Sequence, residues 1–534
     1  MEVIRHGWPR QILYFIVRVL SGIMRMTTST GYRLFQRISQ SPGIPVANPS
    51  LSYWHIPLSP IAKHGSDGSI PLPEDADVVV IGSGITGTSF VRTLMRECQM
   101  QPVRVVMLEA RDVCSGATGR NGGHITPVLY PHYQWLKEEY GVEVAKEIIR
   151  FRLKHLPELL KVAAEEDLLE ESQCREVEYF DVFHDKGLYS EAKELLSEYQ
   201  KDLPLEGSRY KIHEGEETIE RLQLSSKTVG CLSTLGGAIH PYRLVTGILE
   251  RLVEEYPQSF HLFSHTPCTA IKTCREGLYE VLTPKGAIKT RHVVHATNAW
   301  ASHLLPGMRE RIVPLREAMT AQKPREGLGS SPGENKKPWT GDRSFVFYPR
   351  QSLFDFDYLT QQRMVDDEKA AWPAPQGELM LGSNTKNIED IGNVDDREWS
   401  RESESYLQQA LGEYFEVKSK DKEEVKGVWS GIIGTSSDGM PWVGRVPEMI
   451  SGRRVSRASD KGGMAAAGEW LAAGYSGEGM VHAWLSGKTV AQLVLGSPGS
   501  ELPGAFRIGE SRWSRTGVEE GMVRMVMRQT RVNI

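Results

Sequence analysis

The sequence predicts an α/β fold that combines a β-α-β unit with further short, antiparallel strands. Residues 77–108 run through strand, glycine turn, helix and strand, as expected for a β-α-β unit. A second strand, glycine turn and helix occupy residues 470–495. Short apolar runs between residues 269 and 381 have the length and spacing of antiparallel strands. Together the three observations favour a chain that mixes helices with both parallel and antiparallel strands.

The first glycine turn has the spacing of a dinucleotide-binding motif. Four consecutive β-branched residues, 78–81, lead into Gly82-Ser-Gly84-Ile-Thr-Gly87 and a helix. Gly82 permits the sharp turn, Gly84 lets the backbone approach a pyrophosphate, and Gly87 lets the helix pack on the strand. The N–H groups and the dipole at the helix N-terminus favour phosphate. Glu109, 22 residues after Gly87, is placed to bind ribose hydroxyls, so NAD or FAD is favoured over NADP.

Composition narrows the class of protein. The 534 residues predict two or three domains, and 40% hydrophobic and 25% charged residues are typical of a globular enzyme. A net charge of -5 with scattered basic residues gives no basic field, so no nucleic-acid partner is expected. The six cysteines form no Cys-x-x-Cys pair and the chain lacks His-Glu-x-x-His, so neither a disulfide framework nor a bound metal is expected.

The N-terminus predicts a flexible extension over residues 1–40 and an extended arm over residues 41–76. The extension holds six arginines and no acid after Glu2, which resembles a mitochondrial transit peptide. The preferred alternative is a cytoplasmic protein with a flexible N-terminal extension, or one that starts at Met24 or Met26. The apolar segment 11–24 falls short of the roughly 20 residues of a transmembrane helix, so no stable membrane span is expected. The arm is rich in Pro, Ser and Gly, with Tyr53 and Trp54 as anchors.

The second glycine turn extends the ligand hypothesis. Residues 474–480 read Gly-Tyr-Ser-Gly-Glu-Gly-Met and precede a helix over residues 481–495. This arrangement places a second helix N-terminus at a ligand. Two such turns at opposite ends of the chain indicate one long ligand held at both ends. FAD, which is longer than NAD, fits this better.

Seven motifs now point to a known family. They are Gly82-Ser-Gly-Ile-Thr-Gly87, Glu109-Ala-Arg111, Gly116-Ala-Thr-Gly-Arg-Asn-Gly-Gly-His124, Ala238-Ile-His-Pro241, Ala296-Thr-Asn-Ala-Trp300, Asp438-Gly-Met-Pro441 and Gly474-Tyr-Ser-Gly-Glu-Gly-Met480. The chain resembles the FAD-dependent oxidoreductases of the D-amino-acid oxidase, glycine oxidase and sarcosine oxidase class. It is most similar to the gamma-glutamylputrescine oxidoreductase-like branch, including its fungal members. The motifs follow the family order over about residues 75–496.

The resemblance implies a Rossmann-like FAD-binding domain built from discontinuous segments, α+β overall once the substrate domain is included. The FAD-binding segments would be residues 77–135, 226–300 and 426–496. An antiparallel-sheet substrate domain would comprise residues 136–225 and 301–425, and a C-terminal tail residues 497–534.

The resemblance also implies which residues meet FAD. The pyrophosphate would lie at the first glycine turn, the adenosine near Glu109 and residues 269–270, and the flavin near the second glycine turn. The implied FAD-binding residues are Gly82, Gly84, Ile85, Thr86, Gly87, Glu109, Ala110, Arg111, Thr118, Arg120, Asn121, Gly122, Gly123, Thr269, Ala270, Ala296, Thr297, Gly431, Gly477, Gly479 and Met480. Non-covalent FAD is expected because the family register places Asn121, not His124, at the covalent histidine of dimethylglycine dehydrogenases.

The implied reaction oxidises the C–N bond of a small-molecule amine or amino acid, with hydride transfer to the flavin and hydrolysis of the imine. Oxygen or an electron acceptor would reoxidise the flavin, and the oligomeric state is left open. Alternatives are an FAD-dependent step in a specialised biosynthetic pathway and a non-catalytic flavoprotein in trafficking or interaction. The candidate substrate-facing residues are His124, Tyr348, Trp429 and Tyr475. Each has the ordinary alternative of a core side chain. Arg316 or Arg350 could bind a substrate carboxylate.

Overall fold

In the computed structural model, the described residues form two sheets. The described residues are 29–98, 103–274, 277–324, 340–364, 375–384, 387–415, 425–454, 463–499 and 501–517. Residues 1–28, on which the mitochondrial alternative depends, and residues 518–534 of the predicted tail lie outside them. Among the described residues, no helix has both the length and the apolar character needed to cross a membrane.

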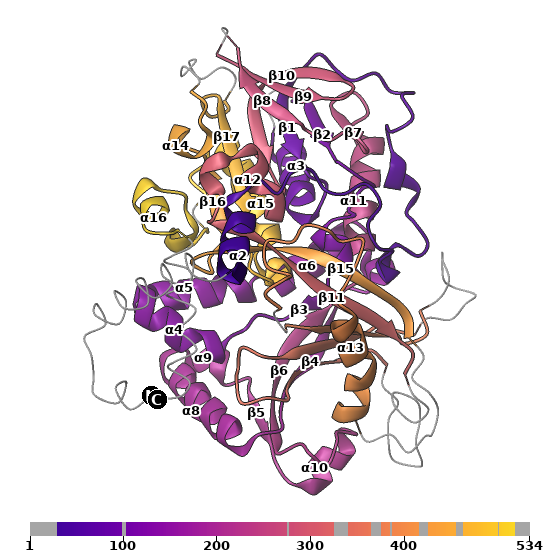
Figure 1. Ribbon diagram of the computed structural model, residues 1–534, viewed down its shortest axis with the longest axis vertical. Coiled ribbons are helices and arrows are strands. Elements are labelled where there is room, and N and C mark those ends of the chain that lie inside the picture. Colours follow the sequence, from indigo (N-terminus) through magenta and orange to yellow (C-terminus); the bar gives the residue numbers. More distant parts are fainter. Residues whose placement is uncertain are drawn as a thin grey trace.

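The first sheet is the predicted parallel sheet, in the order β16-β17-β10-β1-β2-β7 (Figure 1). Its parallel strands are β17, β10, β1, β2 and β7, and β16 joins the edge antiparallel to β17. Its strands are β1 (Asp75–Ile81), β2 (Val105–Leu108), β7 (Phe260–Phe263), β8 (Ala270–Thr273), β9 (Tyr279–Thr283), β10 (Gly286–His295), β16 (Trp442–Arg445) and β17 (Gly468–Ala473). The observed fold confirms the predicted class.

Strand β10 makes two kinds of pairing. Its first half continues the antiparallel β8-β9 hairpin, and its second half runs parallel to β1 and β17. One continuous strand thus joins the hairpin to the parallel sheet. Helices α3 (Ile85–Glu97), α11 (Pro241–Glu255) and α15 (Ala483–Val494) pack over one face of this sheet.

Glycines permit the close approach of α3 to its neighbours. Gly82 has a φ of +106°, and a Cβ there would lie 2.6 Å from the carbonyl oxygen of Ala296. A Cβ on Gly87 would lie 2.1 Å from the Gly82 oxygen, so the helix start meets the strand end. Gly487 of α15 passes the Thr86 oxygen in the same way, at 2.3 Å. Larger residues at these positions would push α3 away from the sheet.

The second sheet has the order β15-β11-β14-β13-β12-β4-β6-β3, with β5 paired to β6. Its pairs are antiparallel except that β12 runs parallel to β4. Its strands are β3 (His124–Ile125), β4 (Arg175–Phe183), β5 (Lys211–His213), β6 (Gly230–Ala238), β11 (Ile312–Gln322), β12 (Arg343–Tyr348), β13 (Asp357–Gln361), β14 (Leu379–Ser383) and β15 (Val425–Ser436).

The two faces of the second sheet have different partners. Helix α13 (Arg401–Tyr414) packs on the outer face, where Phe180, Phe345 and Phe347 belong to its core. The opposite face turns toward the first sheet. Alternating side chains on each strand therefore divide between a closed core and the space between the sheets.

The remaining helices surround the two sheets, with α4, α5, α8 and α9 grouped beside the second one (Figure 1). They are α2 (Ser29–Ser39), α4 (Tyr130–Tyr140), α5 (Val142–Leu153), α6 (His155–Glu165), α7 (Leu169–Ser172), α8 (Lys186–Asp202), α9 (Pro204–Gly207), α10 (Glu216–Arg221), α12 (Ala301–Leu304), α14 (Glu448–Ser451) and α16 (Glu510–Ser514).

The sheet pairing bears on the predicted domain boundaries. The boundaries at residues 226 and 426 assign β6 and β15 to the FAD-binding segments, whereas both strands pair in the second sheet. Residues 501–517 pack on the body of the protein, where Arg512 contacts Asp438 at 2.8 Å and lies over the Trp442 ring at 3.8 Å. The division into domains stays a prediction.

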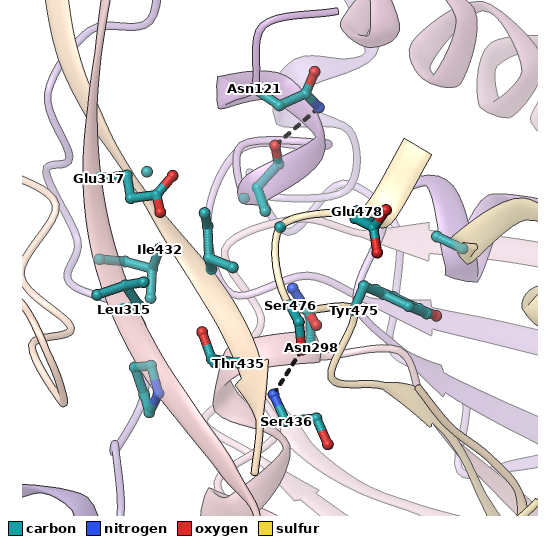
Figure 2. Close-up of a pocket in the computed structure, with 18 of the residues that line it drawn as sticks. Asn121, Asn298, Leu315, Glu317, Ile432, Thr435, Ser436, Tyr475, Ser476 and Glu478 are labelled. Carbon is teal, nitrogen blue, oxygen red and sulfur yellow. Dashed lines mark hydrogen bonds between the residues drawn. The ribbon is translucent and has the colours of Figure 1, made fainter. Parts of the chain in front are cut away.

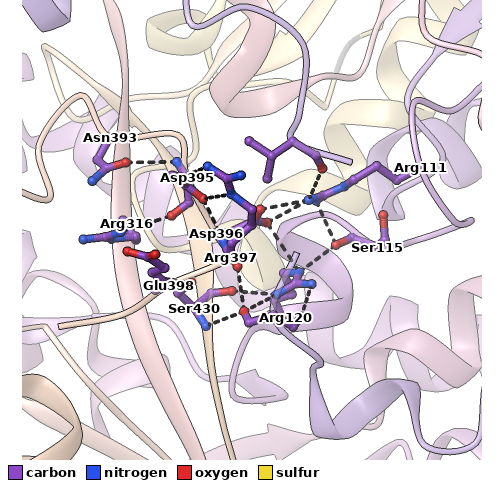
Figure 3. Close-up of polar contacts among 12 residues, drawn as sticks. Arg111, Ser115, Arg120, Arg316, Asn393, Asp395, Asp396, Arg397, Glu398 and Ser430 are labelled. Atoms are coloured by element: carbon purple, nitrogen blue, oxygen red, sulfur yellow. Dashed lines mark hydrogen bonds and ion pairs between the residues drawn. The ribbon is translucent and has the colours of Figure 1, made fainter. Parts of the chain in front are cut away.

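A buried ionic cluster joins four distant segments (Figure 3). Asp396, 0% exposed, accepts hydrogen bonds from Arg111 at 2.9 and 3.0 Å, and Arg120 lies 3.7 Å from it. Arg120 also donates to the carbonyl oxygens of Ser50 at 2.6 Å and Ser430 at 2.7 Å. The Ser50 amide in turn donates to the Asp396 carbonyl at 2.8 Å. Four segments thus meet around one carboxylate: the extended arm, the glycine-rich block (residues 116–124) with the preceding Arg111, strand β15, and the loop that precedes α13.

Replacing Asp396→Asn will destabilise the fold, because it removes the negative charge that compensates two buried guanidinium groups. We expect the free energy of unfolding to fall by about 3–5 kcal/mol in urea denaturation. The control is Asp395→Asn, whose side chain pairs with exposed Arg397. Surface pairs contribute little, so the control should stay near the parent. Equal losses in the two variants would contradict the role of the buried cluster.

Candidate active site

A cavity of about 1020 Å³ lies between the two sheets. This is at the upper end of the ~300–1,000 Å³ range of small-molecule sites. Gly82, Glu109 and Ala296 line it, and each follows the carboxyl end of a strand of the parallel sheet: β1, β2 and β10. Ligands of open α/β sheets bind at this edge. The opposite wall is the inner face of the second sheet.

The glycine-rich block forms a rigid corner of the cavity. It contains a short 3₁₀ helix, Ala117–Arg120, beside the start of α3. The Thr118 hydroxyl accepts a hydrogen bond from the Ile85 amide at 3.1 Å. The Asn121 side chain donates to the Thr118 carbonyl at 2.9 Å and accepts from the Gly123 amide at 2.7 Å. These bonds fix the block against the α3 N-terminus.

The acid after β2 is held by the first glycine turn. One Glu109 carboxylate oxygen accepts from the Ser83 amide at 3.1 Å and from the Ser83 hydroxyl at 2.7 Å. The other accepts from the Arg111 amide at 3.1 Å. The carboxylate is therefore fixed at the cavity wall, and each oxygen retains acceptor capacity.

The second glycine turn closes another side of the cavity (Figure 2). Ser476 accepts from the Ser436 amide at 3.0 Å, and the Asn298 side chain accepts from the Gly474 amide at 3.0 Å. The Tyr475 hydroxyl lies 2.8 Å from the Thr86 hydroxyl of α3. The loop is thus attached to both sheets and to the first glycine turn.

Glu478 in this loop is paired with a buried arginine. Its carboxylate lies 2.9 Å from Arg152, which is fully buried, and accepts from the Val128 amide at 3.2 Å. Arg152 donates through Nε to His482 at 3.2 Å. Burial, with Arg152 nearby, holds the pKa of His482 well below its usual range, so this histidine stays neutral and can accept that bond.

Polar atoms without protein partners face the cavity. Burial lowers the pKa of His124 to about 4, so its ring is neutral at physiological pH. Buried polar atoms in native proteins are nearly always hydrogen-bonded, so unpaired polar atoms on the wall of a cavity are available to partners inside it. Among the described residues, the cavity-lining side chains with an unpaired buried polar atom are Arg111 (Nε), His124 (Nε2), Thr126 (Oγ1), Thr297 (Oγ1), Trp300 (Nε1), His303 (Nε2) and Ser437 (Oγ).

Most of the predicted FAD-binding residues lie on the cavity wall. They are Gly82, Gly84, Ile85, Thr86, Glu109, Ala110, Arg111, Thr118, Arg120, Asn121, Gly122, Ala296, Thr297, Gly431, Gly477, Gly479 and Met480. The side chains of Arg111 and Arg120 are committed to the Asp396 cluster. These two arginines therefore line the cavity with side chains that are held in place, and their guanidinium groups are already engaged by protein acceptors.

Four predicted FAD-binding residues lie away from the cavity wall. Gly87 packs α3 on the first turn, and Gly123 has a φ of +68°, where a Cβ would lie 2.2 Å from the Ile239 oxygen. Thr269 and Ala270 begin the β8-β9 hairpin, where the Thr269 amide donates to Leu282 at 2.8 Å. The preceding Pro267 and Cys268 line the cavity instead.

The predicted substrate-facing residues divide in the same way. His124 and Tyr348 line the cavity. Tyr475 also lines it, but its hydroxyl is engaged by Thr86. Trp429 lies behind the wall, because its Nε1 donates to the Arg120 carbonyl at 2.9 Å. The sequence does not indicate whether an aromatic residue in a strand points into the cavity or into the core behind it.

The two arginines considered for a substrate carboxylate lie elsewhere. Arg316 pairs with Asp390 at 2.8 Å. The Arg350 guanidinium lies over the Tyr406 ring at 5.4 Å. Both line a separate, smaller pocket of about 170 Å³ beside α13.

Several cavity-lining residues were not predicted. Tyr179, Phe356 and Tyr358 come from β4, the loop before β13, and β13 itself, and Glu317 from β11. The sequence of β4 shows the alternation of a strand, but it does not show which of its two faces meets the cavity and which meets the core under α13. Asn298, in the motif after β10, has a φ of +43°, and its side chain accepts a hydrogen bond from the second glycine turn. Its role in the site follows from this backbone geometry and could not be predicted from the sequence.

Comparisons with known proteins agree with this geometry. A probable oxidoreductase OrdL of Haemophilus influenzae is 22% identical over 430 residues, covering 79% of this chain and 84% of that protein. The gamma-glutamylputrescine oxidoreductase of Escherichia coli is 26% identical over 270 residues, covering 48% and 57%. The crystal structure of glycine oxidase from Geobacillus kaustophilus superposes with a TM-score of 0.59 at 17% identity, covering 82% of this chain and 99% of that one, which shows a shared fold.

A family model extends over most of the chain. The model described as DAO, FAD dependent oxidoreductase, matches residues 77–493. This range contains both glycine turns, the glycine-rich block and all strands of the two sheets except the first two residues of β1. The chain therefore belongs to the DAO family of FAD-dependent oxidoreductases.

Proposed function

We propose that this protein binds FAD non-covalently in the cavity and oxidises the C–N bond of an amine or amino acid. The single observation that carries the proposal is the continuous cavity that joins both glycine turns to the inner face of the second sheet. It offers a helix N-terminus at one point and a wall of aromatic side chains at another. Family membership and relatives named as amine and amino-acid oxidoreductases support the chemistry.

The residues present fit the cofactor. The N-terminus of α3 and Gly84 supply backbone N–H groups for a pyrophosphate, and a Cβ on Gly84 would reach Thr118 at 3.0 Å. The Glu109 carboxylate suits ribose hydroxyls. The unpaired Oγ1 of Thr297 and Nε2 of His124 are available to polar atoms of a ligand.

FAD, when bound, supplies the two-electron oxidation that no side chain can provide. The chain must then place the substrate carbon, exclude water and leave the amine unprotonated. A protonated nitrogen has no lone pair to assist loss of hydride from the adjacent carbon, and a free amine has a pKa of about 10. Neutral His124 at the cavity wall suits a hydrogen-bond acceptor for an N–H group.

Finer assignments belong to this proposal as well. Asn121 stands at the register of the covalent histidine of some relatives and is held by three hydrogen bonds, which favours non-covalent FAD. Oxygen or an acceptor protein would take the electrons. We propose the cytoplasm as the location. A specialised biosynthetic oxidation uses the same site and is distinguished by its substrate.

The purified protein should be yellow, with absorption bands at about 370 and 450 nm. Acid precipitation should leave these bands in the supernatant, because nothing links the flavin covalently. Peroxide release or dye reduction against a panel of amines and amino acids then identifies the reaction. A colourless protein that cannot be reconstituted with FAD would refute the proposed function, and bands in the pellet would refute non-covalent attachment.

Replacing Glu109→Gln should weaken FAD binding about tenfold, because a charged acceptor of ribose hydroxyls becomes neutral. The dissociation constant is measured by quenching of flavin fluorescence when apoprotein is titrated. The matched control is Asp112→Asn, three residues later, whose carboxylate pairs with His265 at 2.6 Å. The control should bind FAD as the parent does. Equal affinity of the Glu109 variant and the parent would contradict the assignment.

A further inference from the structure

Five aromatic side chains form a nearly closed ring around one part of the cavity. His124 neighbours Tyr179 at 5.8 Å and Tyr358 at 6.4 Å between ring centroids. Tyr358 neighbours Phe356 at 6.5 Å, and Phe356 neighbours Tyr348 at 6.2 Å. All five line the cavity. Each pair lies within the centroid spacing of interacting aromatic rings, so the ring is a packed structure.

Strand register brings these side chains together. In β4, Tyr179 and Asp181 share the inner face, while Phe180 and Val182 belong to the core under α13. Strand β12 runs parallel beside it and places Tyr348 on the same inner face. Because side chains alternate along a strand, each of these positions is fixed by the burial of its neighbours.

A buried carboxylate closes the ring between Tyr179 and Tyr348. The Tyr179 hydroxyl donates a hydrogen bond to Asp181, which is 1% exposed, and the Tyr348 hydroxyl also interacts with this carboxylate. A tyrosine has one hydroxyl proton. Once that proton is donated to Asp181, Tyr179 can offer a cavity ligand only its ring and an oxygen lone pair. Both attract a positively charged N–H group.

Asp181 has no compensating cation in the part of the chain that the structure describes. Among the described residues, no basic side chain forms an ion pair with it, and the titratable groups that interact with it electrostatically are Tyr130, Tyr179, Tyr210, Tyr348 and, from the other face of the sheet, Cys231. Burial raises the pKa of each of these groups, so they stay neutral at physiological pH. Burial also raises the pKa of Asp181 to about 7, and hydrogen bonds with tyrosines oppose this only in part.

The cationic side chains of the cavity are already committed. Arg111 and Arg120 are the arginines on its wall in the described ranges, and both bind Asp396 or backbone carbonyls. No lysine lines it in the same ranges. Near the aromatic ring, the wall carries Glu317. A substrate carboxylate would therefore have no free positive partner in this part of the cavity, and burying it there would be costly. An ammonium group needs no positive partner.

We propose that the aromatic ring backed by Asp181 is the subsite for the substrate's ammonium group, so that the substrates are alkylamines without an α-carboxylate. This inference rests on the proposed function. Aromatic rings surrounding a cation are a known mode of ammonium recognition. The buried carboxylate behind them adds an attraction that water does not screen.

The same groups account for removal of the amine proton. The ammonium N–H transfers its proton to the Tyr179 hydroxyl oxygen while the Tyr179 proton passes to an Asp181 carboxylate oxygen. The products are a neutral amine with its lone pair, an unchanged Tyr179 and a neutral Asp181. The carboxyl proton returns to solvent after each turnover.

The binding test uses phenyltrimethylammonium, which has no nitrogen lone pair and cannot be oxidised. It should perturb the flavin spectrum of the holoenzyme and bind at least tenfold tighter than its neutral isostere tert-butylbenzene. Tyr358→Leu should remove that preference and Tyr358→Phe should keep it, because the ring and not the hydroxyl is required. Equal affinity for cation and isostere, or loss in both variants, would overturn the subsite.

The pH dependence of turnover distinguishes a proton-accepting Asp181 from an Asp181 that only supports the structure. In the parent, kcat/KM for an amine should rise as pH increases through about 7, because only ionised Asp181 accepts the proton. The Asp181→Asn variant should not show this rise in kcat/KM. Tyr179→Phe should lower kcat at least tenfold and still bind phenyltrimethylammonium. An unchanged rise in Asp181→Asn would overturn the proton route.

A stability measurement checks Asp181 independently of turnover. Its pKa is raised in the folded state, so the folded protein binds this proton more tightly than the unfolded chain. The stability that it contributes is present below about pH 4 and is lost as pH rises through about 7. The parent should therefore lose thermal stability over this window more steeply than Asp181→Asn. Parallel Tm profiles would contradict the buried, unpaired state of Asp181.

Matched substrates separate failure of this inference from failure of the proposed function. The holoenzyme should oxidise 2-phenylethylamine with a kcat/KM about a hundredfold above that for phenylalanine, which differs by an α-carboxylate, because an unpaired buried charge is costly. Preference for the amino acid would overturn the inference and keep the proposed function. A flavin-free protein, or a holoenzyme inactive on both substrate classes, would refute the proposed function itself.

Discussion

The cavity of this protein depends on two buried guanidinium groups held around one buried carboxylate. Arg111 precedes the glycine-rich block and Arg120 lies within it, and Asp396 reaches both from a loop almost three hundred residues away in sequence (Figure 3). Burying charge is costly unless each group is paired and hydrogen-bonded, and here nearly every donor has an acceptor. The consequence is geometric. The block that carries Thr118 and Asn121 cannot shift without breaking this cluster, so the α3 N-terminus keeps a fixed neighbour.

The N-terminal arm completes that constraint. Ser52 donates to the Gly119 carbonyl at 2.7 Å, and Trp54 donates through its ring nitrogen to the Asn121 carbonyl. The Trp54 ring is 2% exposed and packs against His240 at 4.5 Å. A segment with few regular elements of its own thereby covers the back of the glycine-rich block. Rigid support of this kind holds a cofactor site in register without contact with the ligand.

Charge is distributed unevenly along the cavity. Around the two glycine turns, carboxylates and arginines are paired with each other or with backbone groups. Glu478, for example, is paired with Arg152. Facing the second sheet, the wall becomes aromatic, and the histidine on it is neutral because burial lowers the pKa of His124 to about 4. Asp181 remains as a buried acid whose neighbours are tyrosines. One end therefore suits a polar, anionic cofactor and the other a ligand that brings its own positive charge.

The sequence determined the parallel sheet, both glycine turns and most of the wall beside them. Those features depend on local rules: β-branched runs favour strands, and only glycine tolerates the φ of +106° at residue 82 or the 2.1 Å approach at Gly87. It could not determine which face of each antiparallel strand meets the ligand. Tyr348 and Trp429 read alike in sequence, yet Tyr348 lines the cavity and Trp429 bonds Arg120 behind it. Pairing between distant strands made that choice, just as it brought Asp396 to Arg111 and Asp181 to the aromatic ring, because register and burial are set by contacts that no local pattern encodes.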